Sequence, residues 1–174
     1  MIIMPEYFDI VDKDDNIIGK ELRSVCHSNP KLIHRGIFVI IENELGELLL
    51  EKRSMTKDTN PGKLAVIGEH NLLGESYEKA AVRGLKEELG ISTKVKKITK
   101  LKISSERETE FDEIFIAKIN SKEKIKFDKN EISEIIWFSI EQLKKEIKQH
   151  PRRFSSWSLK VLKEYYKYKQ VCLK

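Results

Sequence analysis

The chain has 174 residues, of which 40% are hydrophobic and 35% are charged, and it contains two cysteines. This length fits a single domain over residues 1–174, and the apolar content excludes global disorder. Two cysteines exclude a disulfide-rich secreted scaffold, and the lack of a long apolar run excludes a membrane-spanning helix. We therefore expect a cytoplasmic protein with no signal peptide and no membrane partner.

The net charge of +5 is unevenly distributed along the chain. Residues 141–174 carry ten Lys and Arg against three Asp and Glu, a balance of +7, whereas residues 1–140 carry 23 against 25, a balance of −2. The sequence has no signature of a nucleic-acid-binding module, so we interpret the basic end as a solvated helix over about residues 157–168. Nucleic acid is not expected as a partner.

In chain order, the sequence predicts short strands separated by turns. In the first half, apolar runs predict strands over residues 7–11, 37–41, 48–50 and 64–67. The turn signal at residues 43–46 predicts a hairpin between the second and third of these strands. Later apolar runs predict strands over residues 95–103, 114–119 and 135–138.

Capping residues mark two helices. Ser76 is a good N-cap for the first helix, and Gly90 marks its C-terminal end. Ser139 and Gln142 have the spacing of a capping box, and the second helix is expected to end before Pro151. Helices placed among strands predict an α/β fold.

The segment that indicates chemistry is a glycine-containing loop followed by the first of these helices. Arg83 and Glu87 are four residues apart and can form an ion pair, and Glu88 lies about 100° further round the helix. Glu75, just before the helix, can approach the same face if the loop folds back. Carboxylates on one face repel one another unless a cation lies between them, and oxygen ligands suit Mg²⁺ or Mn²⁺. Adjacent acidic residues are also common on solvated helices, so their spacing alone leaves both interpretations open.

The same segment resembles the Nudix box, G-x5-E-x7-R-E-U-x-E-E-x-G-U, in which U is a bulky aliphatic residue. Placed over residues 69–91, the motif is matched by Glu75, Arg83, Leu85, Glu87, Glu88, Gly90 and Ile91. The resemblance implies an α/β/α sandwich with a mixed sheet. It also implies a Mg²⁺- or Mn²⁺-dependent site for a small-molecule diphosphate, with Glu75, Glu87 and Glu88 at the metal and Arg83 orienting Glu87 or supporting the loop.

Two positions depart from this motif. Glu69 stands where the motif opens with glycine, and Gly84 stands where Nudix hydrolases have a glutamate that helps to hold the catalytic metal. Gly84 offers no side-chain ligand, and a glycine inside a helix costs about 0.5–1 kcal/mol relative to alanine. Glu69 or Glu113 could replace the missing ligand. A protein that binds a diphosphate without cleaving it also remains open.

The rest of the chain resembles the isopentenyl-diphosphate isomerase branch of this superfamily. The residues that carry this resemblance are Phe8–Asp12, Leu32–Gly36, Leu48–Lys57, Pro61-Gly62 and Phe154–Trp157. It implies a second metal site made by His27, His34 and His70 with Glu113, and imidazole ligands favour Zn²⁺ or Mn²⁺. It further implies cationic contacts to the diphosphate and an aromatic ring beside the reacting group, made by Arg23, Arg53, Lys57 and Trp157.

Isomerase chemistry of this kind requires a cysteine that the chain lacks. The matching position is Gly68, or Ile67 if the gap shifts, and Cys26 is expected to be a small buried thiol. The leading hypothesis is therefore a Mg²⁺-dependent hydrolase of a small organic or nucleoside diphosphate, with Glu113 as candidate base. An isomerase variant and a non-catalytic diphosphate-binding module are the alternatives.

Overall fold

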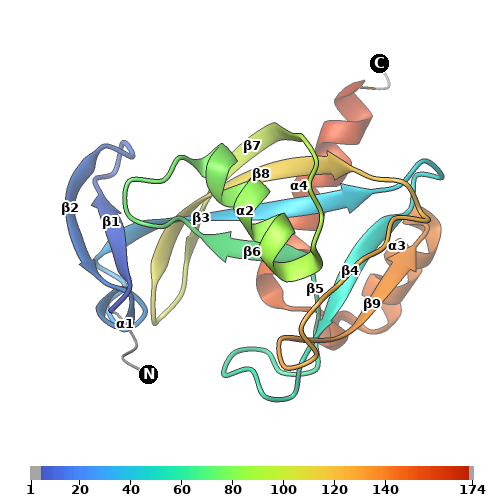
Figure 1. Ribbon diagram of the computed structural model, residues 1–174, viewed down its shortest axis with the longest axis horizontal. Coiled ribbons are helices and arrows are strands. Elements are labelled where there is room, and N and C mark those ends of the chain that lie inside the picture. The colour runs from blue at the N-terminus through green and yellow to red at the C-terminus, as the bar shows by residue number, and fades with distance from the viewer. Residues whose placement is uncertain (1–4, 173–174) are drawn as a thin grey trace.

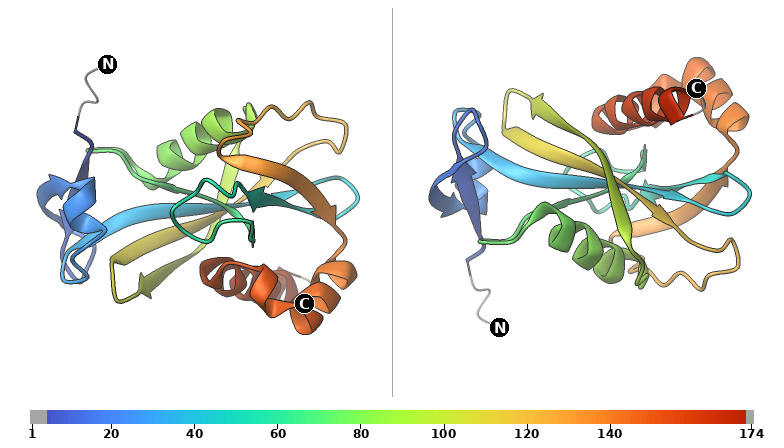
Figure 2. Two further views of the ribbon diagram at one scale, coloured as in Figure 1. Left: turned by 90° about the horizontal axis from the view of Figure 1, so that it is seen from below. Right: turned by 90° about the horizontal axis from the view of Figure 1, so that it is seen from above.

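The computed structural model describes residues 5–172 as a mixed β-sheet with helices on both of its faces (Figures 1 and 2). The strands are β1 (Tyr7–Val11), β2 (Ile17–Leu22), β3 (Ile33–Glu42), β4 (Leu48–Arg53), β5 (Leu64–Ala65), β6 (Ile67–His70), β7 (Val95–Ser104), β8 (Thr109–Lys118) and β9 (Ile132–Phe138). The helices are α1 (Arg23–Cys26), α2 (Tyr77–Leu89), α3 (Ile140–Gln149) and α4 (Ser156–Cys172), with a 3₁₀ turn over Pro151–Arg153.

Strand β3 is the centre of the sheet because it pairs with β1, β4, β6 and β8. Its pairing with β8 is parallel and unbroken, from Ile33 opposite Thr109 to Glu42 opposite Lys118. The other pairings of β3 are antiparallel, as are those of β7 with β8 and β9 with β4. The sheet is therefore mixed, as expected.

Two hydrophobic cores lie on opposite faces of this sheet. On one face, Ile37 and Val39 of β3 pack with Ala81, Leu85 and Leu89 of α2. On the other face, the core contains Phe38 and Ile40 of β3 together with Val161, Leu162 and Tyr165 of α4. Successive strand residues point to opposite faces, so the ten-residue apolar strand β3 serves both cores. This arrangement confirms the α/β/α sandwich (Figure 2).

The helix signals in the sequence are confirmed. Ser76 caps α2 by accepting a hydrogen bond from the Lys79 amide, and Gly90 ends the helix with a φ of 68°. The capping box at Ser139 and Gln142 is formed at the start of α3. Helix α4 is longer than predicted and reaches Cys172, and the short helix α1 was not predicted.

Strand boundaries differ more from the sequence predictions. The predicted strand over residues 37–41 extends to Ile33–Glu42 because β8 pairs with its whole length. The predicted strand over residues 64–67 divides in two, because β5 pairs with β4 while β6 pairs with β3. Pairing with distant strands sets these limits, and an apolar run alone does not show them.

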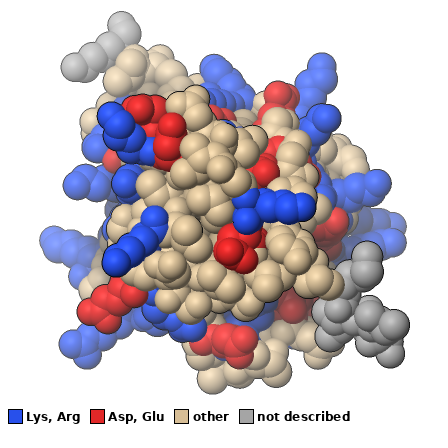
Figure 3. Space-filling view, turned by 90° about the vertical axis from the view of Figure 1, so that its left-hand side faces the viewer, with Lys and Arg blue, Asp and Glu red and all other residues tan. Residues whose placement is uncertain are grey.

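Helix α4 contacts the central strand through polar side chains near its C-terminal end. Lys169 of α4 contacts Glu42 at 2.7 Å, and the Tyr165 hydroxyl donates to the same carboxylate at 3.3 Å. On the described part of the face shown in Figure 3, positive and negative side chains are interspersed. No helix among residues 5–172 has the length and apolar character to cross a membrane.

Candidate metal and diphosphate site

Arg83 of α2 holds together the loop that precedes this helix. Its guanidinium donates to both carboxylate oxygens of Glu75, at 3.0 and 2.9 Å, and to the His70 carbonyl oxygen at 2.8 Å. A fourth hydrogen bond, of 2.9 Å, reaches Glu87 one helical turn later. The hydrogen bonds to Glu75 are the main cause that raises the pKa of Arg83. Arg83 therefore both supports the loop and orients Glu87.

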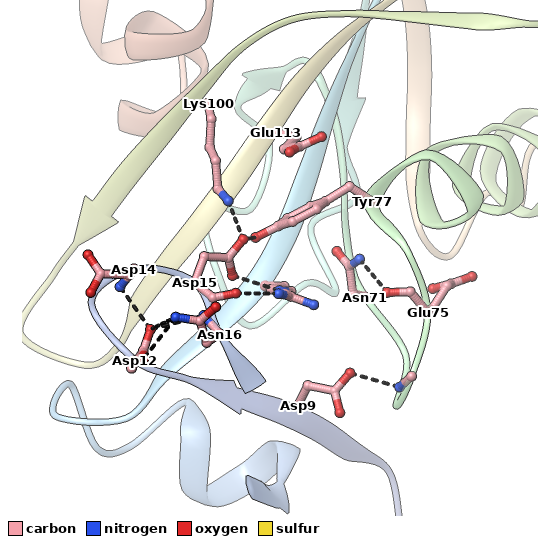
Figure 4. A network of polar contacts seen from close by, with 12 residues as sticks. Asp9, Asp12, Asp14, Asp15, Asn16, Asn71, Glu75, Tyr77, Lys100 and Glu113 are labelled. Atoms are coloured by element: carbon pink, nitrogen blue, oxygen red, sulfur yellow. Dashed lines mark hydrogen bonds and ion pairs between the residues drawn. The ribbon is translucent and has the colours of Figure 1, made fainter. Parts of the chain in front are cut away.

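The β1–β2 hairpin fixes the same loop from the other side (Figure 4). Asp9 of β1 accepts a hydrogen bond of 2.8 Å from the Gly74 amide. At the hairpin tip, Asp15 accepts from the Tyr77 hydroxyl at 2.9 Å and from Arg35 Nε at 2.7 Å, and it contacts Lys100. These contacts tie the start of α2 to the N-terminal hairpin and to β3 and β7.

Three glutamates, Glu51 of β4, Glu69 of β6 and Glu88 of α2, lie on the α2 side of the sheet and are called the carboxylate cluster. Glu69 packs against Gly84, one helical turn before Glu88. Burial is the main cause that raises the pKa of Glu51 to about 7, and the charge of Glu69 adds to it. Burial also raises the pKa of Glu88 to about 8, together with a hydrogen bond to Glu69 and the charges of Glu69 and Glu51. Burial and neighbouring negative charge therefore both favour the protonated forms of Glu51 and Glu88.

Two residues expected at the metal lie at the edge of this cluster instead. Glu75 already accepts hydrogen bonds from Arg83 and from the Leu72 amide, the latter at 2.9 Å. Glu87 points toward solvent with more than half of its side chain exposed, and Arg83 is its partner. Of the three box glutamates predicted as ligands, only Glu88 belongs to the carboxylate cluster.

The cations expected to hold a diphosphate lie beside the carboxylate cluster. The charges of Arg53 and Lys57 both lower the pKa of Glu51 against the effect of burial. Arg53 stacks over the Trp157 ring at 5.5 Å, which brings two predicted substrate residues together. Lys57 forms an ion pair with Glu131. Arg23 lies apart from this group, where it pairs with Glu6 at 2.9 Å.

The three predicted histidines, together with Glu108 and Glu110 of the β7–β8 turn and β8, form a histidine cluster. Ligand atoms of His27, His34, His70 and Glu108 all lie within 4.8 Å of one another. Glu110 contacts Nε2 of His70 at 2.9 Å and Nε2 of His34 at 3.2 Å. His27 Nε2 and His34 Nδ1 are buried and have no hydrogen-bond partner among residues 5–172.

Protonation differs between members of the histidine cluster. Burial, with the charges of His70 and Arg23, lowers the pKa of His27 to about 4. Burial alone would lower the pKa of His70, but the hydrogen bond with Glu110 outweighs it and raises this pKa. Burial would raise the pKa of Glu110, yet its close contacts with His34 and His70 lower this pKa strongly. His27 is therefore neutral at pH 7, as a metal ligand must be.

The glutamates beside the histidines are Glu108 and Glu110, and Glu113 lies elsewhere. Glu113 is opposite Ile37 in the β3–β8 pairing, and Ile37 belongs to the core under α2. Its carboxylate forms an ion pair with Lys97 of β7. Glu110 is three residues earlier on the same strand, so it points to the other face.

The carboxylate cluster and the histidine cluster lie on opposite faces of the sheet. Glu69 pairs with Ile37, which faces α2, whereas Gly68 pairs with Phe38, which faces α4. His70, two residues after Gly68, shares the α4 face by strand alternation. Adjacent residues of β6 therefore serve two separate sites, and Arg83 links them by contacting the His70 carbonyl oxygen and, at 3.9 Å, Glu69.

The position that corresponds to the isomerase cysteine has no room for a thiol. A Cβ atom on Gly68 would lie 2.7 Å from Cε1 of Phe38, so the phenyl ring would have to move. Cys26 is fully buried, and burial is the main cause that raises its pKa. This confirms Cys26 as a small buried thiol and makes it a poor nucleophile at neutral pH.

Sequence reasoning missed three residues of these clusters, namely Glu51, Glu108 and Glu110. Glu51 carries a usable signal, because it stands two residues after buried Leu49 on one strand and therefore on the same inward face. Glu108 and Glu110 have no such signal. Their approach to the histidines depends on the register between β3 and β8, which pairs His34 with Glu110.

Comparison with known proteins agrees with this geometry. The family model described as NUDIX domain matches residues 32–158. An isopentenyl-diphosphate Delta-isomerase of Serratia proteamaculans is 30% identical over 166 residues, which span 92% of each chain. A prenyl-diphosphate phosphatase of Methanosarcina mazei is 29% identical over 147 residues, which span 83% of this chain and 86% of that protein.

Two further matches complete the comparison. A protein named as an uncharacterized Nudix hydrolase from Yersinia pestis is 36% identical over 88 residues, and the match spans only 48% of that protein. Among solved structures, DR0079 from Deinococcus radiodurans superposes with a TM-score of 0.77 at 23% identity, over 92% of this chain and 99% of that one. This last match supports the fold, and the matched domain covers most of the sequence. The chain therefore belongs to the NUDIX family.

Proposed function

We propose that this protein is a Mg²⁺- or Mn²⁺-dependent hydrolase that cleaves a small organic or nucleoside diphosphate. The observation that carries the proposal is the buried carboxylate of Glu51, which lies 3.5 Å from Arg53 and belongs to the same cluster as half-buried Glu88 of the box helix. A diphosphate bound through a divalent cation requires this combination of carboxylate oxygens for the metal and cationic donors for the phosphates.

The donor set fits a hard divalent cation. Glu51 is buried and Glu88 is half-buried, and a divalent cation between them would offset both the burial of these carboxylates and the negative charge of Glu69. Glu87, held by Arg83 at the exposed edge, is a further candidate ligand. A bound Mg²⁺ would polarise the diphosphate and lower the pKa of an attacking water.

The protein's own residues supply binding and proton transfer. Arg53 and Lys57 neutralise phosphate charge, and Trp157 stacks against Arg53 and holds its guanidinium toward the site. A pKa of about 7 suits Glu51 to accept a proton at neutral pH. Glu113, the base predicted from sequence, lies on the same face as Glu69 but two strands away, about 10 Å between Cα atoms by strand spacing.

The experiment is a combined phosphorus and proton NMR assay of the full chain with Mg²⁺ in D₂O. The substrates are nucleoside diphosphates, isopentenyl diphosphate and a longer prenyl diphosphate, the last two suggested by the isomerase and phosphatase relatives. We expect new phosphate signals, and at least about a 100-fold slower release in Glu88→Gln, since a metal ligand is lost. Glu78→Gln, an exposed position on the same helix, is the matched control. Diphosphate binding without turnover of any substrate would contradict the hydrolase and leave the binding module.

The histidine cluster favours an isomerase as the second candidate function. Its three imidazoles and two carboxylates are grouped as a metal site requires, but Gly68 and Phe38 occupy the place of the thiol. The same assay separates the two functions. Deuterium incorporated into isopentenyl diphosphate, with the diphosphate intact, would overturn the hydrolase proposal in favour of the isomerase.

We also propose that the histidine cluster holds a transition metal, Zn²⁺ or Mn²⁺. Buried imidazole nitrogens without hydrogen-bond partners are costly unless a ligand satisfies them. After dialysis against Mg²⁺ buffer, elemental analysis is expected to find about one transition metal per chain. His27→Gln and His70→Gln should lose it, whereas His150→Gln, which changes an exposed histidine at the end of α3, should retain it. Equal metal content in all four proteins would contradict the site.

A further inference from the structure

The two departures from the box, Glu69 and Gly84, lie in contact with each other. A Cβ atom on Gly84 would stand 2.7 Å from Cγ and 3.2 Å from Cβ of Glu69. These are the atoms nearest the backbone of β6, so they cannot swing aside as the end of a long side chain would. Gly84 is buried in the middle of α2, and only glycine leaves room there for the stem of Glu69.

The carboxylate of Glu69 lies within the carboxylate cluster. Glu88 follows Gly84 by one helical turn on the same face of α2, so Glu69, which packs against Gly84, lies next to the turn that carries Glu88. Arg83 lies 3.9 Å from the Glu69 carboxylate. Glu69 therefore extends from the strand into the space between strand and helix. A side chain at position 84 would fill the same space from the helix.

We infer that residues 69 and 84 form a reciprocal exchange, in which Glu69 of β6 supplies the metal-binding carboxylate that the helix lacks at Gly84. The motif has glycine on the strand and glutamate on the helix, and this chain has the reverse at two positions in contact. One carboxylate is present in either arrangement, so the number of ligands is kept. The inference rests on the proposed function, because it assigns a ligand to the metal of that site.

The test measures Mg²⁺ binding by the full chain at pH 8, from the shift of the thermal unfolding midpoint with Mg²⁺ concentration. Mg²⁺ is the probe because imidazole ligands do not favour it, so the histidine cluster adds little to the signal. Glu69→Gln keeps the shape of the side chain and removes its charge. We expect it to unfold at a higher temperature than the native chain without Mg²⁺, yet to bind Mg²⁺ at least 10-fold more weakly. Glu78→Gln, the control, should bind Mg²⁺ as the native chain does.

A double variant that exchanges residues 69 and 84 tests the reciprocal arrangement directly. Gly84→Glu alone places two carboxylates in one space and is expected to lower the unfolding midpoint. Adding Glu69→Gly to Gly84→Glu is expected to restore both the midpoint and the Mg²⁺ affinity, the latter to within about threefold of the native value. If the double variant does not fold, the comparison of Glu69→Gln with Glu78→Gln decides the question alone.

The outcomes separate this inference from the proposed function. If Glu69→Gln binds Mg²⁺ as tightly as the native chain while Glu88→Gln does not, the exchange is wrong and the hydrolase proposal stands. If the native chain shows no Mg²⁺-dependent shift and releases no phosphate, the proposed function and the exchange are both overturned. Loss of Mg²⁺ affinity in Glu69→Gln, recovered in the double variant, supports both.

Discussion

Replacing Arg83 with methionine is expected to lower the free energy of unfolding by about 3 kcal/mol, the size typical of breaking a buried ion pair. Methionine keeps most of the apolar stem but removes four charged hydrogen bonds, to Glu75, Glu87 and the His70 carbonyl. Glu75, whose side chain is only 13% exposed, then loses its ion-pair partner. Urea unfolding of the native chain and the variant measures the loss.

Two further variants identify the cause of that loss. Arg83→Lys keeps the charge but not the planar fork, so we expect it to lose about half as much stability as Arg83→Met. Adding Glu75→Gln to Arg83→Met removes the stranded carboxylate and should recover part of the loss, by about 1 kcal/mol. A loss below about 1 kcal/mol in Arg83→Met would show that the guanidinium does not hold the loop.

Raising the pH from 6.5 to 8.5 is expected to destabilise the metal-free protein and to strengthen its response to Mg²⁺. Glu51 and Glu88 have pKa values of about 7 and about 8, above the ordinary value of 4.5. Between pH 4.5 and these values, the folded chain keeps protons that the unfolded chain has released, so stability falls as the pH rises. His70, whose pKa is also raised, changes stability in the same direction.

The size of the pH effect follows from the number of protons involved. Each proton contributes up to about 1.4 kcal/mol per pH unit, and solvent screening of half-buried Glu88 reduces the sum to about 1–2 kcal/mol over this range. Mg²⁺ must displace the same protons, so its apparent affinity rises with pH. We expect the same fixed Mg²⁺ concentration to raise the unfolding midpoint by several degrees at pH 8.5 and hardly at all at pH 6.

Calorimetric scans at the two pH values, with and without Mg²⁺, measure both effects. Glu88→Gln should flatten the pH dependence and remove most of the Mg²⁺ response, while the exposed control Glu78→Gln should keep both. An unfolding midpoint that rises between pH 6.5 and 8.5, or a Mg²⁺ response independent of pH, would contradict the assignment of raised pKa values to this cluster.

Much of the local structure could be predicted from neighbouring residues alone. Helix α2 begins after Ser76 and ends at Gly90 because a serine oxygen satisfies free amides and glycine adopts the left-handed conformation without strain. The capping box of α3 has the same local origin. Strand lengths were less predictable. The limits of β3, β5 and β6 depend on which distant strands provide hydrogen-bond partners.

The candidate site divides in the same way. The spacing of Arg83 and Glu87 on one helix was enough to predict their ion pair. The resemblance in sequence was enough to bring His27, His34 and His70 together. Which glutamates join them could not be predicted. Side chains along a strand alternate between the two faces of the sheet. Glu110 and Glu113 are three positions apart, so they point to opposite faces, and Glu110 is the one on the face of the histidines.

The sequence by itself determined the family, the box helix with its Arg83–Glu87 pair, and the three histidines, because motif spacing and resemblance are contained in the order of residues. Only the tertiary structure decided how they combine. The pairing of β6 with β3 directs Glu69 toward α2 and His70 toward the opposite layer. The packing of α2 on β6 brings Gly84 against Glu69 and turns two separate departures from a motif into one contact. Both results depend on strand register and helix packing between distant residues, and no local spacing along the chain contains them.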